Sequence, residues 1–390
     1  MAAIDLGTDY MGVPLANPIV VASAGITETL DRLRRAEDAG AGAAVMKSWF
    51  ETDLVRRSPT PRFRLLHRGL PGFRSTTLYS FEQASTFDLQ RYAQEVARAK
   101  EALDMPVIAS ANCVTDDGWR EWSRAMEQAG ADALELNVSC PFGPQMLGQA
   151  IVAAEMTRVT ALVKAAAQVP AATKMTPQLA NPVAAAQAIE ASGADGLVMF
   201  NRFTGLDVDL EREAPVMHGG YAGHGGAWAL QYVLRWISAT YPRLSIPMAA
   251  SGGVADGDDV VKLILCGATV VETCAAVVLG GWEVVPRLLE GVRRFMEAKG
   301  YGSPADFRGK VCERILASEQ VDRRRLAVAV IDESPCTSCG LCERVCIYGA
   351  ARAGEQSYAI ARELCSGCGL CEQVCPAVAI TMQLLDSVGA

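Results

Sequence analysis

A repeated pattern of four cysteines near the C-terminus constrains this chain more than any other feature. The run Cys-x2-Cys-x2-Cys-x3-Cys begins at Cys336 and occurs again from Cys365, where Pro376 follows it. Bacterial two-cluster ferredoxins have this spacing, and in them each run gives three thiolates to one 4Fe-4S cluster and its fourth thiolate to the other. The repeat predicts a ferredoxin-like domain with two clusters, one on Cys336, Cys339, Cys342 and Cys375 and the other on Cys346, Cys365, Cys368 and Cys371. Paired zinc knuckles are the alternative.

Upstream of these cysteines, apolar runs of strand length alternate with helix-like segments. The expected strands are residues 19–24, 43–48, 107–112, 133–139, 171–176, 196–201, 246–251 and 269–276. The expected helices are residues 28–39, 88–103, 117–129, 149–168, 182–192, 227–241 and 256–266. Three of these helices are followed by Gly40, Gly130 or Gly193, and glycine supplies the left-handed residue that ends many helices. The alternation predicts an α/β fold, a (β/α)8 TIM barrel, with an open doubly wound sheet as the alternative.

The length of the chain fits two domains. A barrel of this kind takes about 250 residues, so the chain of 390 residues leaves room for the cluster domain. The connector over residues 300–332 is charged and includes three consecutive arginines. Few contacts cross such linkers. We therefore place the boundary near Glu319, with the barrel over residues 1–319 and the ferredoxin-like domain over residues 320–390.

Composition and charge narrow the possible roles. The formal charge of −8 gives no sign of nucleic-acid binding. The N-terminus lacks the basic stretch and apolar core of a signal peptide. The most apolar stretch, residues 268–285, is interrupted by Glu272 and Glu283, so we expect no membrane span. Because thiolate ligands need a reducing compartment, a soluble cytoplasmic protein is the simplest expectation.

Cys140 is the candidate catalytic residue. It stands just past the carboxyl end of the expected strand 133–139, and Pro141 ends that strand. The loops at this face of an α/β barrel carry its reactive groups. We therefore expect the thiol of Cys140 to donate and accept a proton. Its alternative role is that of a small buried hydrophobe, since free cysteine is frequently buried.

The other strand ends carry polar or unusually small residues, which we expect to surround a bound ligand. Lys47 and Lys174 predict a bound anion or an electron-rich ring, because an unpaired ammonium is costly to bury. Lysines that extend to the solvent-facing rim are the alternative. The candidate ligand-binding residues at strand ends are Ala22, Ser23, Ala24, Lys47, Ser48, Asn112, Asn137, Lys174, Asn201, Arg202, Ser251, Gly252, Gly253 and Ala275.

Glycine-rich turns flank the seventh expected strand. Residues 219–223, with Gly220 and Gly223, precede the strand, and Gly252 and Gly253 follow it. Backbone amides near the seventh and eighth strands of barrels commonly bind phosphate. These turns predict a phosphate site.

The long connection between the second and third expected strands is rich in arginine and proline. Such a composition predicts a solvated loop. The alternative is a lid over an anionic substrate.

Clusters carry single electrons, so the chain needs an electron source. No G-x-G-x-x-G fingerprint lies between an expected strand and helix. We therefore expect an electron-donor protein rather than NAD(P)H bound by this chain.

Several of these motifs together resemble the dihydroorotate dehydrogenase family of FMN barrels. With the cluster tail, the similarity is greatest to the pyrimidine-reducing half of the dihydropyrimidine dehydrogenases. It covers the barrel to about Lys299 and the tail from about Asp332. The motifs are Lys47-Ser48, Asn137-Val138-Ser139-Cys140-Pro141, Lys174, Asn201, Gly219-Gly220 and Ser251-Gly252-Gly253. The resemblance implies an oxidoreductase of CH-CH bonds with FMN, a small-molecule substrate, and a homodimer or a heteromer with an NAD(P)H-flavin reductase subunit or a ferredoxin.

The resemblance also implies roles for individual residues. Cys140 would be the general acid or base facing the flavin, and Asn137 and Asn201 would bind substrate amide or carbonyl groups. Lys47 and Lys174 would contact the isoalloxazine or the ribityl chain. The phosphate would lie on Gly220, Gly223, Gly252 and Gly253. Reducing a C=C bond conjugated to a carbonyl requires a hydride, which flavin N5 supplies, and a proton, which a thiol can supply.

The sequence departs from the family at positions that are expected to bind the substrate. Phe142 and Arg202 stand where the family commonly has a polar residue and a serine or threonine, and an expected asparagine near residues 78–80 has no clear counterpart. Arg202 predicts an anionic partner, which is either the substrate or a nearby carboxylate of the chain. Three alternative functions stay open: a reductase of another unsaturated carboxylate or thioester, a dihydroorotate dehydrogenase, and an electron-transfer subunit. The activity of an electron-transfer subunit would not depend on Cys140.

Overall fold

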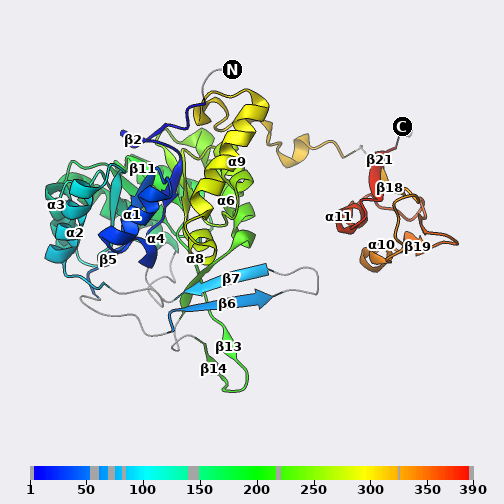
Figure 1. The fold of residues 1–390 in the computed structure, drawn as a ribbon, viewed down its shortest axis with the longest axis horizontal. Helices are drawn as coiled ribbons and strands as arrows, with labels where there is room; N and C mark the ends of the chain where they lie inside the picture. Colours follow the sequence, from blue (N-terminus) through cyan, green and yellow to red (C-terminus); the bar gives the residue numbers. More distant parts are fainter. Residues whose placement is uncertain are drawn as a thin grey trace. The chain divides into compact units, whose positions relative to one another are not determined.

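The computed structural model describes residues 4–52, 61–68, 75–80, 85–138, 149–216, 221–323 and 326–385. The chain divides into two compact units, Met1–Arg314 and Ile315–Ala390 (Figure 1). The division falls within the charged connector, a few residues before Glu319. No helix within these described ranges is long and apolar enough to cross a membrane.

A closed parallel barrel forms the first unit. Its strands are β3 (Ile19–Val21), β4 (Ala43–Val45), β8 (Val107–Asn112), β9 (Ala133–Leu136), β10 (Ala171–Met175), β11 (Gly196–Met199), β16 (Met248–Ser251) and β17 (Val270–Thr273). Each strand lies within an expected range. They pair in this order, β17 pairs with β3, and the short strand β5 (Trp49–Phe50) adds to β8. Because β4 pairs with β8, the ring has no open edge there, and the doubly wound alternative is wrong.

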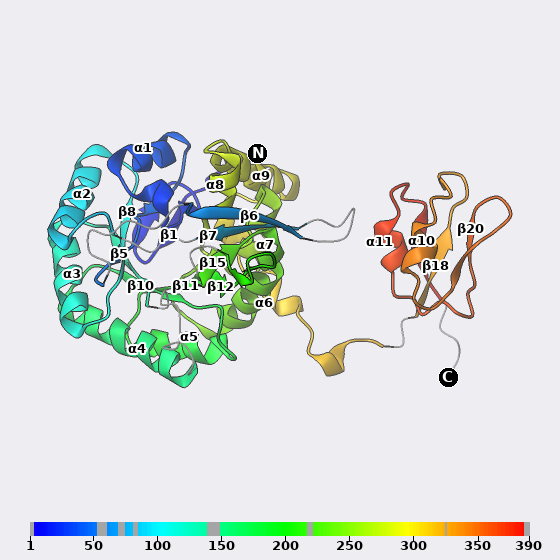
Figure 2. The same cartoon turned by 90° about the horizontal axis from the view of Figure 1, so that it is seen from below.

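Helices surround the barrel, as Figure 2 shows. They are α1 (Leu30–Asp38), α2 (Leu89–Ala102), α3 (Asp116–Gln128), α4 (Gln149–Ala166), α5 (Pro182–Ala191), α6 (Leu230–Thr240), α7 (Gly257–Leu265), α8 (Ala275–Gly280) and α9 (Val284–Lys299). The expected glycine ends are confirmed, since Gly40, Gly130 and Gly193 have φ of 87°, 78° and 96°.

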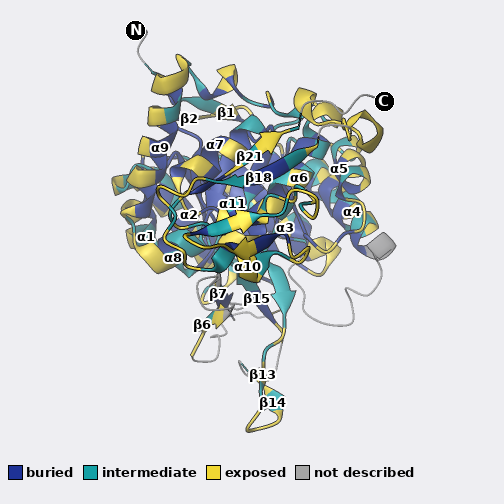
Figure 3. Ribbon diagram, turned by 90° about the vertical axis from the view of Figure 1, so that its right-hand side faces the viewer, coloured by how far each residue is buried: buried dark blue, intermediate teal, exposed yellow. Residues whose placement is uncertain are grey.

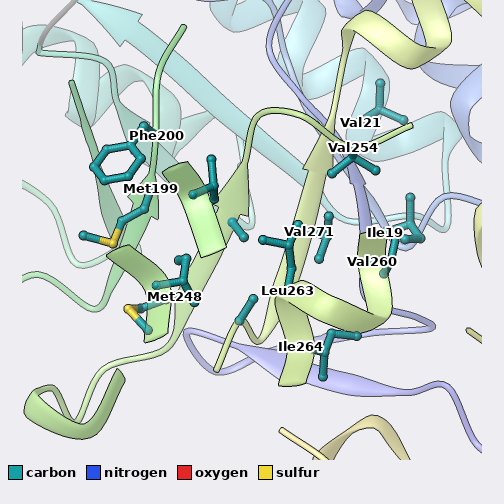
Figure 4. Packing of buried hydrophobic residues seen from close by; sticks show 14 of the residues in the cluster. Ile19, Val21, Met199, Phe200, Met248, Val254, Val260, Leu263, Ile264 and Val271 are labelled. Atoms are coloured by element: carbon teal, nitrogen blue, oxygen red, sulfur yellow. The ribbon is translucent and has the colours of Figure 1, made fainter. Parts of the chain in front are cut away.

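The helices pack their apolar faces on the outside of the strands. Val260 and Ile264 of α7 belong to the same buried cluster as Ile19 and Val271 of the strands (Figure 4). In α9 the side chains of Val284, Leu288, Val292 and Met296 are buried at helical spacing, and the opposite face is exposed (Figure 3). Most residues on this exposed face are charged.

The N-terminal hairpin of β1 (Thr8–Tyr10) and β2 (Val13–Leu15) closes the amino-terminal end of the barrel. Tyr10 and Met11 are buried with inward-facing residues of the strands. A Cβ on Gly196, the first residue of β11, would lie 2.7 Å from Sδ of Met11. The barrel is therefore plugged at this end, and only its carboxyl end is available for a site.

A small antiparallel sheet, the flap sheet, accompanies the barrel. It consists of β6 (Phe63–Arg68), β7 (Ser75–Ser80), β12 (Phe203–Gly205) and β15 (Ala222–Gly225), in the order β12-β15-β7-β6. A separate hairpin, β13 (Val208–Asp209) and β14 (Ala214–Pro215), projects away from the barrel below β6 and β7 in Figure 1. The solvated-loop interpretation is wrong for residues 63–68 and 75–80, which form paired strands.

The second unit repeats a short helix within each cysteine run, between its second and fourth cysteines. α10 (Leu341–Val345) and α11 (Leu370–Val374) each begin after a left-handed glycine. The unit also contains two antiparallel strand pairs: β18 (Ala327–Ile331) with β21 (Ile380–Leu384), and β19 (Ala351–Ala353) with β20 (Tyr358–Ile360). Ala329, Ala351 and Ile380 form its buried core with Cys342 and Cys371.

Candidate active site

A cavity of about 740 Å³ is lined by residues at the carboxyl ends of the barrel strands and by the flap sheet. This volume lies within the usual range for small-molecule sites. The flap sheet contributes Phe63, Leu78 and Ser80. The expected site residues that line the cavity are Ala22, Ser23, Ala24, Lys47, Ser48, Asn137, Lys174, Asn201, Arg202, Gly223, Ser251, Gly252, Gly253 and Ala275. Strand ends that are far apart in sequence thus meet in one cavity, and the individual roles stay predictions.

Three expected residues stand apart from this group. Asn112 is buried at the end of β8, where its Nδ2 donates to the carbonyl oxygen of Asn137 at 2.8 Å, so its contact is with the strand end rather than the cavity. Cys140 and Gly220 lie outside the described residues.

Two asparagines are held in one fixed arrangement. Asn201 Nδ2 donates to Asn137 Oδ1 at 2.7 Å, and Asn137 Nδ2 donates to Ser48 Oγ at 3.2 Å. Asn201 Oδ1 accepts from the backbone N–H of Arg202 at 2.9 Å. Each amide keeps further hydrogen-bonding capacity. The pair can therefore present oriented donors and acceptors to a planar ligand with amide or carbonyl groups.

The Arg202 side chain lies between the cavity and the flap sheet. Its Nη1 donates to Ser80 Oγ at 3.1 Å and to the Ser80 carbonyl oxygen at 3.4 Å. A Cβ on Gly223 would lie 2.1 Å from Cδ of Arg202, so the glycine makes room for the arginine. Gly223 lies within β15 rather than in a turn, and its predicted phosphate role stays a prediction.

A buried ionic triad borders the cavity, which two of its members, Lys174 and Glu272, line. Lys174 Nζ lies 2.7 Å from Glu272 Oε2 and 3.2 Å from Glu135 Oε2, and all three side chains are at most 7% exposed. The sequence indicates a ligand role for Lys174, but no role for either glutamate was predicted. The available signal was a charged residue inside each of two fully buried strands, β9 and β17.

The surroundings shift the pKa values of the triad. Burial and repulsion by Glu272 raise the pKa of Glu135 to about 8, although Lys174 opposes this. Burial lowers the pKa of Lys174, but the two carboxylates raise it more, so its pKa lies above the ordinary value. Lys174 therefore stays charged, and Glu135 changes its charge near neutral pH.

The pKa of Glu135 predicts a pH-dependent stability. A carboxyl whose folded-state pKa is raised stabilises the fold below its unfolded pKa of about 4.3, and this contribution is lost as pH rises through about 8. We expect the free energy of unfolding to fall over this window more steeply in the natural protein than in Glu135→Gln. Urea denaturation at several pH values measures both slopes. Parallel profiles would contradict the assignment.

The donor set of the cavity fits an FMN. Thr273 Oγ1 is buried at the cavity wall and has no hydrogen-bond partner among the described residues, so a ligand can satisfy it. Gly252 and Gly253 follow β16 with φ of 112° and 86°, where backbone amides can approach a phosphate closely. Lys47 supplies positive charge, whereas the charge of Lys174 is already balanced by Glu135 and Glu272. The cavity walls add aromatic side chains, among them Phe203 and Trp228, whose ring centroids are 5.2 Å apart.

The cysteines of the second unit line two separate small cavities. The first is lined by Cys336, Cys339, Cys342 and Cys375, and the second by Cys346, Cys365, Cys368 and Cys371. These are the two sets that the spacing predicts. Sγ of Cys346 accepts from the N–H of Ala350 at 3.3 Å, and Sγ of Cys375 accepts from the N–H of Ala379 at the same distance. The two crossing ligands therefore have equivalent surroundings, as expected of an internal repeat.

Loss of one crossing ligand tests this pairing. We expect Cys346→Ser to remove the cluster that it shares with the second cysteine run, lowering bound iron by roughly half, because three thiolates hold a cluster poorly. Iron and sulfide analysis measures the loss. Cys312→Ser, a cysteine whose Sγ donates to the carbonyl oxygen of Cys266 in the barrel unit, is the matched control. Full iron content in Cys346→Ser would disprove the pairing.

Comparison with known families agrees with both units. The family model described as dihydroorotate dehydrogenase matches residues 5–296, and two models of a 4Fe-4S binding domain match residues 328–351 and 358–381. The zinc-knuckle alternative is therefore wrong, and the cofactors are FMN and two 4Fe-4S clusters.

Among curated relatives, the NAD-dependent dihydropyrimidine dehydrogenase subunit PreA of Escherichia coli K12 is 27% identical over 92% of this chain and 89% of its own length. The catalytic subunits of dihydroorotate dehydrogenase B (NAD(+)) from Methanothermobacter thermautotrophicus and Methanosarcina acetivorans are 29% and 31% identical, over 76% and 74% of this chain and 95% and 91% of their own lengths. These relatives are oxidoreductases of CH-CH bonds. The chain belongs to the dihydroorotate dehydrogenase family, as an FMN-dependent oxidoreductase that also carries two 4Fe-4S clusters.

Proposed function

We propose that this protein reduces, or in the reverse direction forms, a C=C bond conjugated to a carbonyl in a pyrimidine or a related ring that carries an anionic group. The observation that supports this most is the meeting of the Asn137–Asn201 pair and Arg202 in the cavity that fits the flavin. Amides match the carbonyl and N–H groups of such a ring, and a guanidinium matches a carboxylate.

The chain's own residues carry most of this chemistry. Asn137 and Asn201 orient the ring, and the flap sheet limits access of water to it. Cys140 gives a proton to the carbon next to the one that receives hydride, or takes a proton in the reverse direction. Bound FMN supplies the hydride at N5 and exchanges single electrons with the clusters. The mechanism needs no further ionisable group at the reacting carbons.

The electrons come from a partner protein in this proposal. The PreA relative is named as a subunit of an NAD-dependent enzyme, and the dihydroorotate dehydrogenase relatives are named as catalytic subunits. The chain has no dinucleotide fingerprint of its own. We infer a heteromer with an NAD(P)H-flavin reductase subunit, or reduction by a ferredoxin.

An anaerobic assay of the reconstituted full chain tests the proposal. The dithionite-reduced protein is mixed with uracil, thymine, orotate and a panel of unsaturated acids and thioesters, and flavin absorbance is followed. We expect reoxidation by a ring that carries a carboxylate. Reoxidation by acyclic acids or thioesters alone supports the alternative reductase, and no reoxidation by any of them supports an electron-transfer subunit.

Arg202→Ala tests whether Arg202 binds the anionic group of the substrate. Because a charged hydrogen bond contributes about 1.5–3 kcal/mol, we expect KM for anionic substrates to rise by about tenfold to a hundredfold, with neutral substrates little changed. Gly223→Ala should act in the same direction without removing the charge, since its Cβ would displace the arginine stem. Arg212→Ala, on an exposed arginine 83% accessible, is the control. An unchanged KM for every substrate would refute the role.

A further inference from the structure

The buried ionic triad beside the flavin cavity holds one more carboxylate than ammonium. Glu135, Lys174 and Glu272 come from β9, β10 and β17, and Lys174 contacts both carboxylates. With both glutamates ionised, the triad carries one net negative charge in a buried site. A dry interior strongly disfavours such a surplus, and one additional proton removes it. The triad is therefore built to exist in two protonation states.

A row of serine hydroxyls connects this triad to the cavity. Ser110 Oγ donates to Glu135 Oε1 at 3.3 Å, and it lies 2.8 Å from Ser48 Oγ. Ser48 Oγ lies 3.0 Å from Ser23 Oγ, and Ser23 and Ser48 both line the cavity. Each hydroxyl can donate toward the next in the direction of Glu135. Glu135, which is 1% exposed, thus has a hydrogen-bonded path for a proton from the cavity.

We propose that the Glu135–Glu272 pair around Lys174 is a proton store that takes up one proton when the flavin in the cavity beside it is reduced. Two-electron reduction with one proton, by electrons from the clusters, adds one negative charge to the cavity. Protonation of Glu135 or Glu272 removes one negative charge. The total charge of the site stays constant, and hydride transfer to substrate, which restores the oxidised flavin, releases the stored proton.

The ionisable groups around Glu135 are consistent with this role. Tyr10, from the N-terminal hairpin, lies near both glutamates, and burial together with these carboxylates raises its pKa well above its ordinary value, so it stays neutral. Tyr92 of α2 donates to the carbonyl oxygen of Ser110 at 3.0 Å, and burial raises its pKa too. Lys174 stays charged. Among these groups Glu135 is left to exchange the proton, because its carboxyl has a pKa raised to about 8.

Infrared difference spectroscopy tests the proposal on the reconstituted full chain, reduced electrochemically without oxygen. In the natural protein at about pH 9, above the ordinary range of a carboxyl, we expect reduction to produce the carbonyl band of a protonated carboxylic acid, shifted in D2O. Glu135→Gln and Glu272→Gln should each lack this band. The matched control is Glu95→Gln, another buried glutamate, which lies on α2 and pairs with Arg98. It should retain the band.

Proton uptake provides the second measurement. At about pH 9 an indicator dye should report about one more proton per reduced flavin in the natural protein than in Glu135→Gln. The flavin midpoint potential of the natural protein should also fall more steeply with pH, by about 30 mV per pH unit for one proton in a two-electron couple. Absence of the carboxylic acid band in the natural protein, or equal uptake in all variants, would overturn the proton store. Neither result depends on which substrate is turned over, so the proposed function is tested separately.

Discussion

Cys140→Ala is expected to lower turnover of the substrate by about 10²–10⁴-fold, the usual contribution of general acid–base catalysis. The alanine removes the only proton donor that the sequence predicts at the reacting carbon, while the binding of FMN and the clusters is left intact. Single-turnover measurements isolate the effect, because reduction of the flavin by dithionite should be unchanged and only its reoxidation by substrate should slow.

Cys140→Ser is the informative companion variant. A hydroxyl is a far weaker acid than a thiol, so turnover should remain low, with its pH dependence moved toward alkaline values. Cys113→Ser is the control and should turn over substrate normally. Cys113 is buried, and burial, followed by the charge of Glu51, raises the pKa of its thiol. Full activity in Cys140→Ala would remove the general-acid role and favour the electron-transfer subunit.

Lys174→Met is expected to have the largest effect on stability. It leaves Glu135 and Glu272 without their shared cation in a buried site, and breaking a buried ion pair by removing one partner costs about 3–5 kcal/mol. Because the pKa of Lys174 is raised in the folded protein, its contribution is fully present below the unfolded lysine pKa of about 10.4 and is lost only at higher pH. Chemical denaturation at neutral pH measures the loss.

The pH dependence of this loss identifies its cause. In Lys174→Met the two glutamates can become neutral by protonation, so the destabilisation should shrink in acid and grow as pH rises through neutrality. The triple variant with Glu135→Gln and Glu272→Gln should recover most of the stability, since no unpaired charge then remains. Lys262→Met is the control, because this lysine is 52% exposed and pairs with Asp259 near the surface. A loss that does not vary with pH would indicate a packing defect instead.

Most of the fold could be predicted from local patterns. Each barrel strand lies inside an expected apolar run, and the glycines that follow three helices have the left-handed conformation that their positions predict. Strands buried on both faces are continuous apolar runs, so their positions can be recognised without knowing their partners. The flap sheet could not be recognised in this way, because β7 gains its second neighbour from β15, far along the chain.

The residues of the candidate site also fall into two groups: those that local sequence patterns predict, and those whose roles depend on contacts between distant parts of the chain. Residues that follow a strand end could be assigned to the cavity, because all parallel strands of a barrel end at one face. The roles of Glu135 and Glu272 could not be assigned. Their partner Lys174 is 39 residues from one and 98 from the other, and a glutamate in a strand shows only that something must balance its charge.

The spacing of the cysteines was sufficient to predict two 4Fe-4S clusters, because runs of this spacing give three thiolates to one cluster and the fourth to the other. The alternation of strands and helices was sufficient to predict the barrel. Only the tertiary structure decided which ionisable groups meet beside the flavin cavity. Closure of the ring turns side chains of β9, β10 and β17 into one buried interior, where water is excluded and charges must compensate one another.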